Sequence, residues 1–190
     1  MISTIQAHAG VAALTSDEEL MAAVSGGARA PFEQLFERYR QPIWGFFRRR
    51  VPDPAVAEDL AQNVFAALLE AAPRYQARGA FRSYLFGIAF NVLQAERRKQ
   101  SSRTGVLLDD MPDQGAPDAD RTLWVRAALA QLDVDDRELV MLREYEGLSY
   151  QEIAEVRQLP LNTVRSRLFR ARMALRTLLV ADREKQEHSR

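Results

Sequence analysis

The sequence predicts an all-α protein made of two small helical domains joined by a flexible acidic linker, the C-terminal domain being a helix-turn-helix. Two observations predict this fold. Apolar residues recur at helical spacing in every long segment, and the alternation typical of strands is scarce. One stretch, 101–119, gathers glycine, proline, serine and aspartate and has no sustained period, so we interpret it as the linker. The length of 190 residues suits one domain or two small ones.

The N-terminal domain is expected over 16–100, after a disordered tail at 1–15. Thr15 and Glu18 have the spacing of a capping box, which predicts the start of the first helix. The second helix is rich in aromatic residues and should kink near Pro42. The third places a single apolar stripe along its length and should end before a proline, and the fourth closes with a basic run. The expected helices span 15–24, 31–51, 52–72 and 81–100.

The C-terminal domain is expected over 120–181, followed by a tail at 182–190. Ser149 can cap a short helix, and Pro160 suits the first position of the next helix, where no amide donor is needed. Two helices joined by a turn of three to four residues, the second long and cationic, describe a helix-turn-helix. The expected helices span about 120–132, 134–144, 149–156 and 160–180.

Charge is strongly segregated along the chain although the formal net charge is zero. Residues 28–103 carry thirteen Lys and Arg against seven acids, residues 104–119 carry four Asp and no base, and residues 120–156 carry nine acids against four Arg. Residues 157–180 carry six Arg and no acid. Because a polyanion responds to the local field and not to the total charge, this pattern favours a nucleic-acid partner.

The last predicted helix has one apolar face and one arginine-rich face. Val164, Leu168 and Leu175 fall on the apolar side, whereas Asn162, Ser166, Phe169 and Arg170 point away from it. Arginine can meet guanine or phosphate with two parallel hydrogen bonds. A merely solvated face is the competing interpretation, but ordinary surface helices mix both signs of charge.

Several other functions are excluded or lack support. There is no cysteine, and His8 and His188 lie in the terminal tails, so we expect no metal, no cofactor and no catalysis. Glu58 and Asp59 are adjacent acids without a nucleophile motif, which argues against a hydrolase. No apolar run is long enough to span a membrane and the N-terminus is not a secretory signal, so a cytoplasmic protein without membrane insertion is expected.

The segment "REYEGLSYQEIAEVRQLPLNTVRSRLFRARMALRTLL" closely resembles region 4 of sigma-70-family initiation factors, in the extracytoplasmic-function (ECF) group. Two departures occur in the turn, where Gln158 stands at a usual Gly and Pro160 at a frequent Ser. The resemblance implies that this helix-turn-helix reads the −35 promoter element. Arg165 and Arg167 lie nearer the apolar rim and are expected to hold phosphate. The predicted −35 set is Asn162, Thr163, Arg165, Ser166, Arg167, Phe169 and Arg170.

The segment "AEDLAQNVFAALL" resembles region 2 of the same family, which docks on the clamp helices of the polymerase β′ subunit. The family also implies a contact with the β flap. "FRSYLFGIAFNVL" resembles the segment after the −10-reading loop. Three positions there depart from the family: Tyr84 replaces Trp, Phe90 replaces Arg and Ala95 replaces Asp. The predicted polymerase set is Asp59, Gln62, Asn63 and Phe65.

"PRYQARGAF" mixes cations with aromatic rings between two predicted helices. Cations that follow phosphate beside aromatics that stack on bases are what single-strand binding requires, at about 1–3 kcal/mol per stacked base. Phe81, Tyr84 and Phe86 have helical spacing, and aromatic residues in that pattern are more often core residues, whereas Tyr75, in the loop, is the better stacking candidate. The aromatic and basic run 44–50 is similarly open to a core interpretation. The predicted −10 set is Arg74, Tyr75, Arg78, Phe81, Arg82, Tyr84 and Asn91.

The resemblance therefore implies a dissociable promoter-specificity subunit of bacterial RNA polymerase. Its expected partners are core polymerase, promoter DNA and an anti-sigma factor. The alternative is an autonomous helix-turn-helix regulator whose N-terminal domain senses a ligand or dimerises. The two differ in a simple respect, since an autonomous regulator binds duplex DNA alone, usually as a dimer on paired half-sites.

Overall fold

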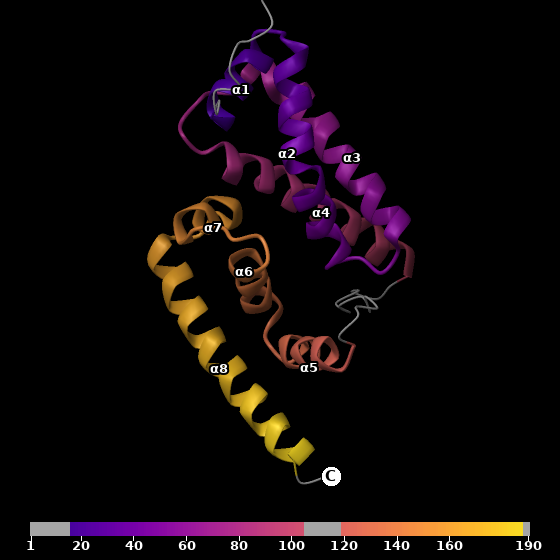
Figure 1. The fold of residues 1–190 in the computed structure, drawn as a ribbon, viewed down its shortest axis with the longest axis vertical. Helices are drawn as coiled ribbons and strands as arrows, with labels where there is room; N and C mark the ends of the chain where they lie inside the picture. Colours follow the sequence, from indigo (N-terminus) through magenta and orange to yellow (C-terminus); the bar gives the residue numbers. More distant parts are fainter. Residues whose placement is uncertain (1–15, 105–118, 188–190) are drawn as a thin grey trace, which may run out of the picture.

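The computed structural model describes residues 16–104 and 119–187, and every regular element within them is helical, which confirms the predicted class (Figure 1). The predicted N-terminal tail, most of the predicted linker and the last three residues lie outside the described residues. The elements are α1 (Asp17–Ser25), α2 (Arg29–Arg48), α3 (Pro54–Ala71), the 3-10 turn η1 (Ala72–Arg74), α4 (Phe81–Thr104), α5 (Ala119–Ala130), α6 (Val134–Glu144), α7 (Tyr150–Arg157) and α8 (Leu161–Glu187).

Helix α1 begins with a capping box, but one residue later than predicted. The Glu19 amide donates to Ser16 Oγ at 3.2 Å, and the Ser16 amide donates to Glu19 Oε2 at 2.8 Å. Glu19 and not Glu18 therefore closes the capping box, and Thr15, the predicted cap, lies outside the described residues. Glu18 points instead toward the loop before α4, where it accepts the Phe81 amide at 2.5 Å.

We call residues 16–104 the first half of the molecule and residues 119–187 the second half. Helices α2, α3 and α4 form the apolar centre of the first half. Helix α2 continues past Pro42. Helix α3 starts after its cap, Asp53, two residues later than predicted, and it ends before Pro73, as predicted. Helix α4 runs to Thr104, so the predicted linker begins too early. The reason is local, because no glycine or proline interrupts the sequence between Gly87 and Gly105.

The helix-turn-helix consists of α7, a short turn and α8. Ser149 caps α7 and forms a capping box with Glu152, which confirms the predicted start. Pro160 lies just before the first turn of α8 and not at its first position, and its carbonyl accepts the amides of Thr163 and Val164. Gln158 ends α7 in the left-handed conformation, with φ at 50°.

The backbone at Gln158 leads to a stability prediction. A residue with a Cβ is strained in this conformation by roughly 1–2 kcal/mol, whereas glycine adopts it freely. We expect Gln158→Gly to raise the free energy of unfolding by about 1 kcal/mol after its greater unfolded-state entropy is counted. Gln158→Ala, which keeps the Cβ, should give no gain. Thermal and urea unfolding measure both, and a loss of stability in the glycine variant would contradict the prediction.

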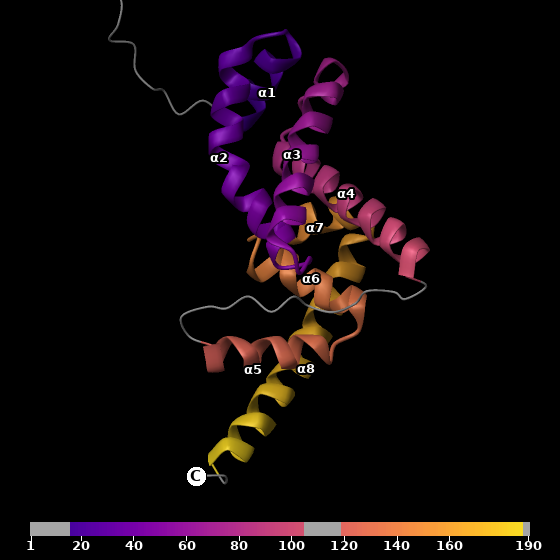
Figure 2. The same ribbon diagram turned by 90° about the vertical axis from the view of Figure 1, so that its right-hand side faces the viewer.

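The two halves of the molecule pack against each other and are not held apart. Helix α7 lies on α4, and both views show the helix-turn-helix beside the last helix of the first half (Figures 1 and 2). Buried apolar residues of the two halves form one continuous cluster. In the part of the chain that the structure describes, no helix is long and apolar enough to cross a membrane.

Candidate nucleic-acid interface

A cavity of about 650 Å³ opens between the loop before α4 and the face of α4 itself. Five members of the −10 set line it: Arg74, Tyr75, Arg78, Tyr84 and Asn91. Sequence reasoning therefore placed these residues together correctly, although their role remains a prediction. One lining residue comes from the second half, namely Glu155 on α7.

The loop beside this cavity is anchored by a single carboxylate. Glu18 accepts the Tyr75 hydroxyl at 2.8 Å and the Phe81 amide at 2.5 Å, so α1 fixes both ends of the loop. Burial and the hydrogen bond to Glu18 raise the pKa of Tyr75. The Tyr75 ring lies 5.0 Å from the Tyr84 ring, which gives the cavity an aromatic wall. Such a wall suits stacking with an unpaired base.

Two members of the −10 set do not line the cavity. Phe81 is only 2% exposed and packs against Tyr39 and Tyr75, so it belongs to the core and cannot meet a base. Arg82 turns toward the second half, where it donates to the backbone carbonyls of Glu146 and Gly147. We correct the −10 set accordingly: Phe81 supports the loop from beneath, and Arg82 is engaged elsewhere in this arrangement.

Helix α8 has the apolar face and the exposed face that the sequence predicts, with few exceptions. Val164, Leu168 and Ala171 are buried against the other helices of the second half. Phe169 is 65% exposed on the side of α8 away from these residues. Thr163 is half-buried at the edge. The exposed members of the −35 set are Asn162, Arg165, Ser166, Phe169 and Arg170.

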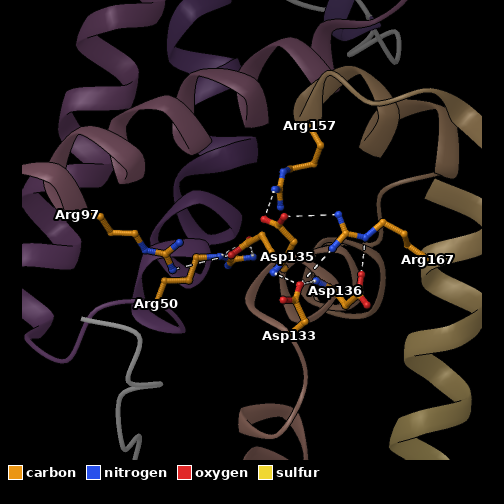
Figure 3. Close-up of polar contacts among 8 residues, drawn as sticks. Arg50, Arg97, Asp133, Asp135, Asp136, Arg157 and Arg167 are labelled. Carbon is orange, nitrogen blue, oxygen red and sulfur yellow. Dashed lines mark hydrogen bonds and ion pairs between the residues drawn. The ribbon is translucent and has the colours of Figure 1, made fainter. Parts of the chain in front are cut away.

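Arg167 does not belong to this exposed face. Its guanidinium lies 2.5 Å from Asp136, 3.2 Å from Asp133 and 3.5 Å from Asp135, all at the start of α6 (Figure 3). These carboxylates raise the pKa of Arg167 although burial opposes this, and the hydrogen bond from Arg157 lowers the pKa of Asp135. The expected phosphate contact of Arg167 is thus replaced by a structural one, which clamps α8 to α6.

A second cavity, of about 320 Å³, lies between α2 and α3. Gln62 lines it, and Asp59 and Asn63 are exposed on the same helix, so three members of the polymerase set share one surface. Phe65 is buried at the base of the cavity, where its ring packs 4.8 Å from that of Phe36, so we correct its role to support.

Sequence reasoning missed two residues of this surface. Trp44 is 40% exposed and Phe36 is 36% exposed, and both line the cavity from α2. The sequence did contain a signal, since both are large apolar residues on a helix whose buried stripe runs through Leu35, Tyr39, Ile43 and Phe46. Phe36 follows Leu35 by one position and Trp44 follows Ile43 by one, which places both at the edge of the stripe, whereas Phe47 lies four positions after Ile43 and is buried.

The fold and site together define a helical DNA-binding protein, in which a helix-turn-helix accompanies a separate aromatic and cationic cavity. Family comparison agrees: the model of sigma-70 region 2 matches residues 35–103, and the model of sigma-70 region 4 matches residues 122–175. The chain is 32% identical over 176 residues to the RNA polymerase sigma-H factor of Pseudomonas aeruginosa, covering 84% of this chain and 91% of the relative. It is 31% identical over 177 residues to the ECF RNA polymerase sigma-E factor of Escherichia coli, covering 84% and 92%.

The fold also resembles a solved structure of CnrH in complex with the cytosolic domain of CnrY. The TM-score is 0.67 at 26% identity, and the match covers 87% of this chain and 98% of that chain. The protein belongs to the sigma-70 family, in its extracytoplasmic-function group.

Proposed function

We propose that this protein is a dissociable initiation subunit that binds core RNA polymerase in the cytoplasm and directs it to specific promoters without catalysing a reaction itself. The observation that carries the proposal is that the exposed face of α8 and the cavity beside α4 are two distinct surfaces on different halves of the molecule. The exposed face of α8 suits duplex −35 DNA, and the cavity beside α4 suits unpaired −10 bases. The first half acts as region 2, over 16–100, and the second as region 4, over 120–181.

Reconstituted transcription tests this proposal. Purified protein added to core polymerase should produce specific transcripts from a subset of genomic fragments, and core polymerase alone should not. An autonomous regulator would instead bind duplex promoter DNA without polymerase. The two relatives are both named as RNA polymerase sigma factors, which favours the polymerase subunit over the autonomous regulator. Tight, sequence-specific binding of a dimer of this protein to duplex DNA in the absence of core polymerase would contradict the proposal.

Core polymerase is proposed to dock on the surface formed by Phe36, Trp44, Asp59, Gln62 and Asn63. What supports this is the combination of exposed aromatic rings with a cavity and polar groups at its rim, which is typical of an interface hot spot. The partner surface is the β′ clamp helices, as the family resemblance implies. A second contact, between region 4 and the β flap, is proposed on the same ground.

Trp44→Ala is therefore expected to weaken binding to core polymerase by roughly tenfold or more, since buried tryptophan anchors are often worth 2 kcal/mol at an interface. Leu69→Ala is a matched control, because Leu69 is also a large exposed apolar residue of the first half but does not line the cavity. Competition between labelled wild type and each variant for core polymerase measures the effect. Equal losses in both variants would contradict the assignment.

An anti-sigma factor is the remaining proposed partner. The similar structure of CnrH is that of a complex with the cytosolic domain of another protein, which supports a protein partner for this fold. Co-purification of the chain with the product of an adjacent gene, and release of transcription when that protein is removed, would test the proposal.

A further inference from the structure

Gly87 stands inside α4 and lines the cavity beside that helix. A glycine in a helix interior lowers the ratio of folded to unfolded protein by roughly fivefold relative to alanine, because it loses more backbone freedom on folding. Its presence in the middle of a long helix therefore needs a physical reason. The two usual reasons are a left-handed backbone and a close neighbour that leaves no room for a side chain.

Neither reason applies to Gly87. Its backbone is helical, and it is not among the described glycines with a positive φ. A Cβ built on Gly87 would meet no atom within 4 Å. Gly45, inside α2, is different, since a Cβ there would lie 3.0 Å from the guanidinium of Arg49. The space above Gly87 is thus open, although the fold leaves room there for a side chain.

The neighbours of Gly87 on the same face of α4 suit a nucleotide base. Tyr84 lies three residues before it and Asn91 four residues after it, and both line the cavity. Side chains at this spacing share one face of a helix, so Gly87 forms a gap between an aromatic ring and an amide whose residues stand about 10 Å apart along the axis. A ring can stack on a base, and an amide can both donate to and accept from a base edge.

Cations stand on the loop side of this gap. Arg74 and Arg78 are exposed and line the same cavity from the loop before α4, where they can follow the phosphates of a strand. The carboxylate of Glu155 also lines the cavity and accepts the hydroxyl of Ser83. The cavity therefore offers cations to a backbone and, at Gly87, a surface without a side chain to a base.

We propose that Gly87 is a specificity-determining residue, because its missing side chain lets one unpaired base of a DNA strand lie against the backbone of α4 between Tyr84 and Asn91. We call this place the Gly87 notch. A side chain at position 87 would fill the notch and lift the base away from the amide that meets its edge. The inference rests on the proposed function, because it takes the ligand of the cavity to be the unpaired −10 strand.

Substitutions at position 87 of the full chain test the proposal, because they should change stability and binding in opposite directions. Gly87→Ala and Gly87→Leu both improve helix propensity, so both variants should unfold at a higher urea concentration than wild type. Their affinity for a short fluorescent single DNA strand of random sequence should fall, by roughly tenfold or more for leucine and by less for alanine, as the loss of a stacked base predicts.

Ala22→Leu is the control for added size. Ala22 is exposed on α1 and does not line the cavity. This variant should bind the strand within about twofold of wild type, because its leucine lies away from the stacking surface. An equal loss of affinity in Ala22→Leu and Gly87→Leu would show that the effect is not specific to the notch.

A strand of the same length without bases distinguishes the base from the phosphates. Wild type and Gly87→Leu should bind this abasic strand within about twofold of each other, because no base is present to enter the notch. A loss of roughly tenfold on the abasic strand would show that the sugar–phosphate chain lies at Gly87, which would overturn the proposal.

Three further results would overturn the inference. Both position 87 variants could bind the strand as tightly as wild type, or Gly87→Ala could be less stable than wild type, which would show that the fold itself needs the glycine. Wild type could also bind no single strand, either alone or with core polymerase.

Initiation with core polymerase decides the proposed function separately. If wild type fails to initiate while Gly87→Leu weakens strand binding, the proposed function fails and the Gly87 notch stands. If wild type initiates and both position 87 variants bind and initiate as it does, the proposed function stands and the Gly87 notch fails.

Discussion

Arg170→Ala is expected to lower initiation at cognate promoters roughly ten- to hundredfold, because a good bidentate contact with a guanine discriminates by about 1–3 kcal/mol. Arg170 is exposed beside Phe169 on the face of α8 opposite Val164 and Leu168. The loss should flatten the preference at one −35 base pair. Initiation measured across promoters in which each −35 base is varied provides the test.

Two other arginines of the same helix serve as controls. Arg165→Ala should weaken binding to all sequences alike and reduce its salt dependence, as expected for a phosphate contact. Arg167→Ala should instead lower the stability of the helix-turn-helix, because it leaves the aspartates at the start of α6 without their shared cation. If Arg167→Ala changed base preference while Arg170→Ala lowered every promoter equally, the faces of α8 would be assigned the wrong way round.

Arg50→Met is expected to separate the two packed halves of the molecule without melting the helices. Arg50 donates to Glu138 at 2.8 Å and to Glu146 at 2.9 Å. Removing the cation leaves buried Glu138 with only Arg97 at 3.9 Å, whereas Glu146 keeps its ion pair with Arg49. Breaking a buried pair in this way costs about 3–5 kcal/mol. In the wild type, burial opposes ionisation of both partners, yet their mutual attraction raises the pKa of Arg50 and lowers that of Glu138. Separation of the two halves exposes the carboxylates of Glu138 and Glu146 to water, so the free-energy cost of the missing cation is removed by separation and not by unfolding.

Small-angle scattering and circular dichroism together measure this outcome. The radius of gyration should rise while the helical signal stays constant. Arg49→Met is the matched control, because Arg49 is partly exposed and Arg50 still neutralises Glu146 when it is lost. A variant of Arg50 that stays as compact as wild type would show that Arg50 does not hold the halves together.

Local patterns in the sequence predicted the helices and much of the candidate site. The start of α7 at Ser149 follows from a capping box, and the faces of α8 follow from helical period. Tyr75 and Tyr84 were assigned to one −10 set because they stand in one short loop and in the helix after it, and their rings lie 5.0 Å apart. These are properties of neighbouring residues, so sequence alone determines them.

Contacts between distant segments could not be predicted in the same way. Arg167 has the spacing of a rim residue on α8, and only the placement of α6 brings Asp136 to its guanidinium. The pairing of Arg50 with Glu138 joins residues 88 positions apart. Many acids and arginines on this chain are equally suitable by type, and the choice among them depends on how the helices pack.

Because Thr104 and Ala119 are joined covalently, the two halves that meet where α4 contacts α7 are always at a high concentration relative to each other. Two partners joined by a short connection meet at an effective concentration on the order of millimolar, which another molecule present at micromolar levels cannot match. A ligand that binds a surface buried between the two halves must therefore displace one of them, and it loses apparent affinity in proportion to the rarity of the separated form. A ligand that engages both halves at once recovers that loss through bivalent binding. Such competition favours a large, two-site partner over small or single-site ones, whatever the strength of each separate contact.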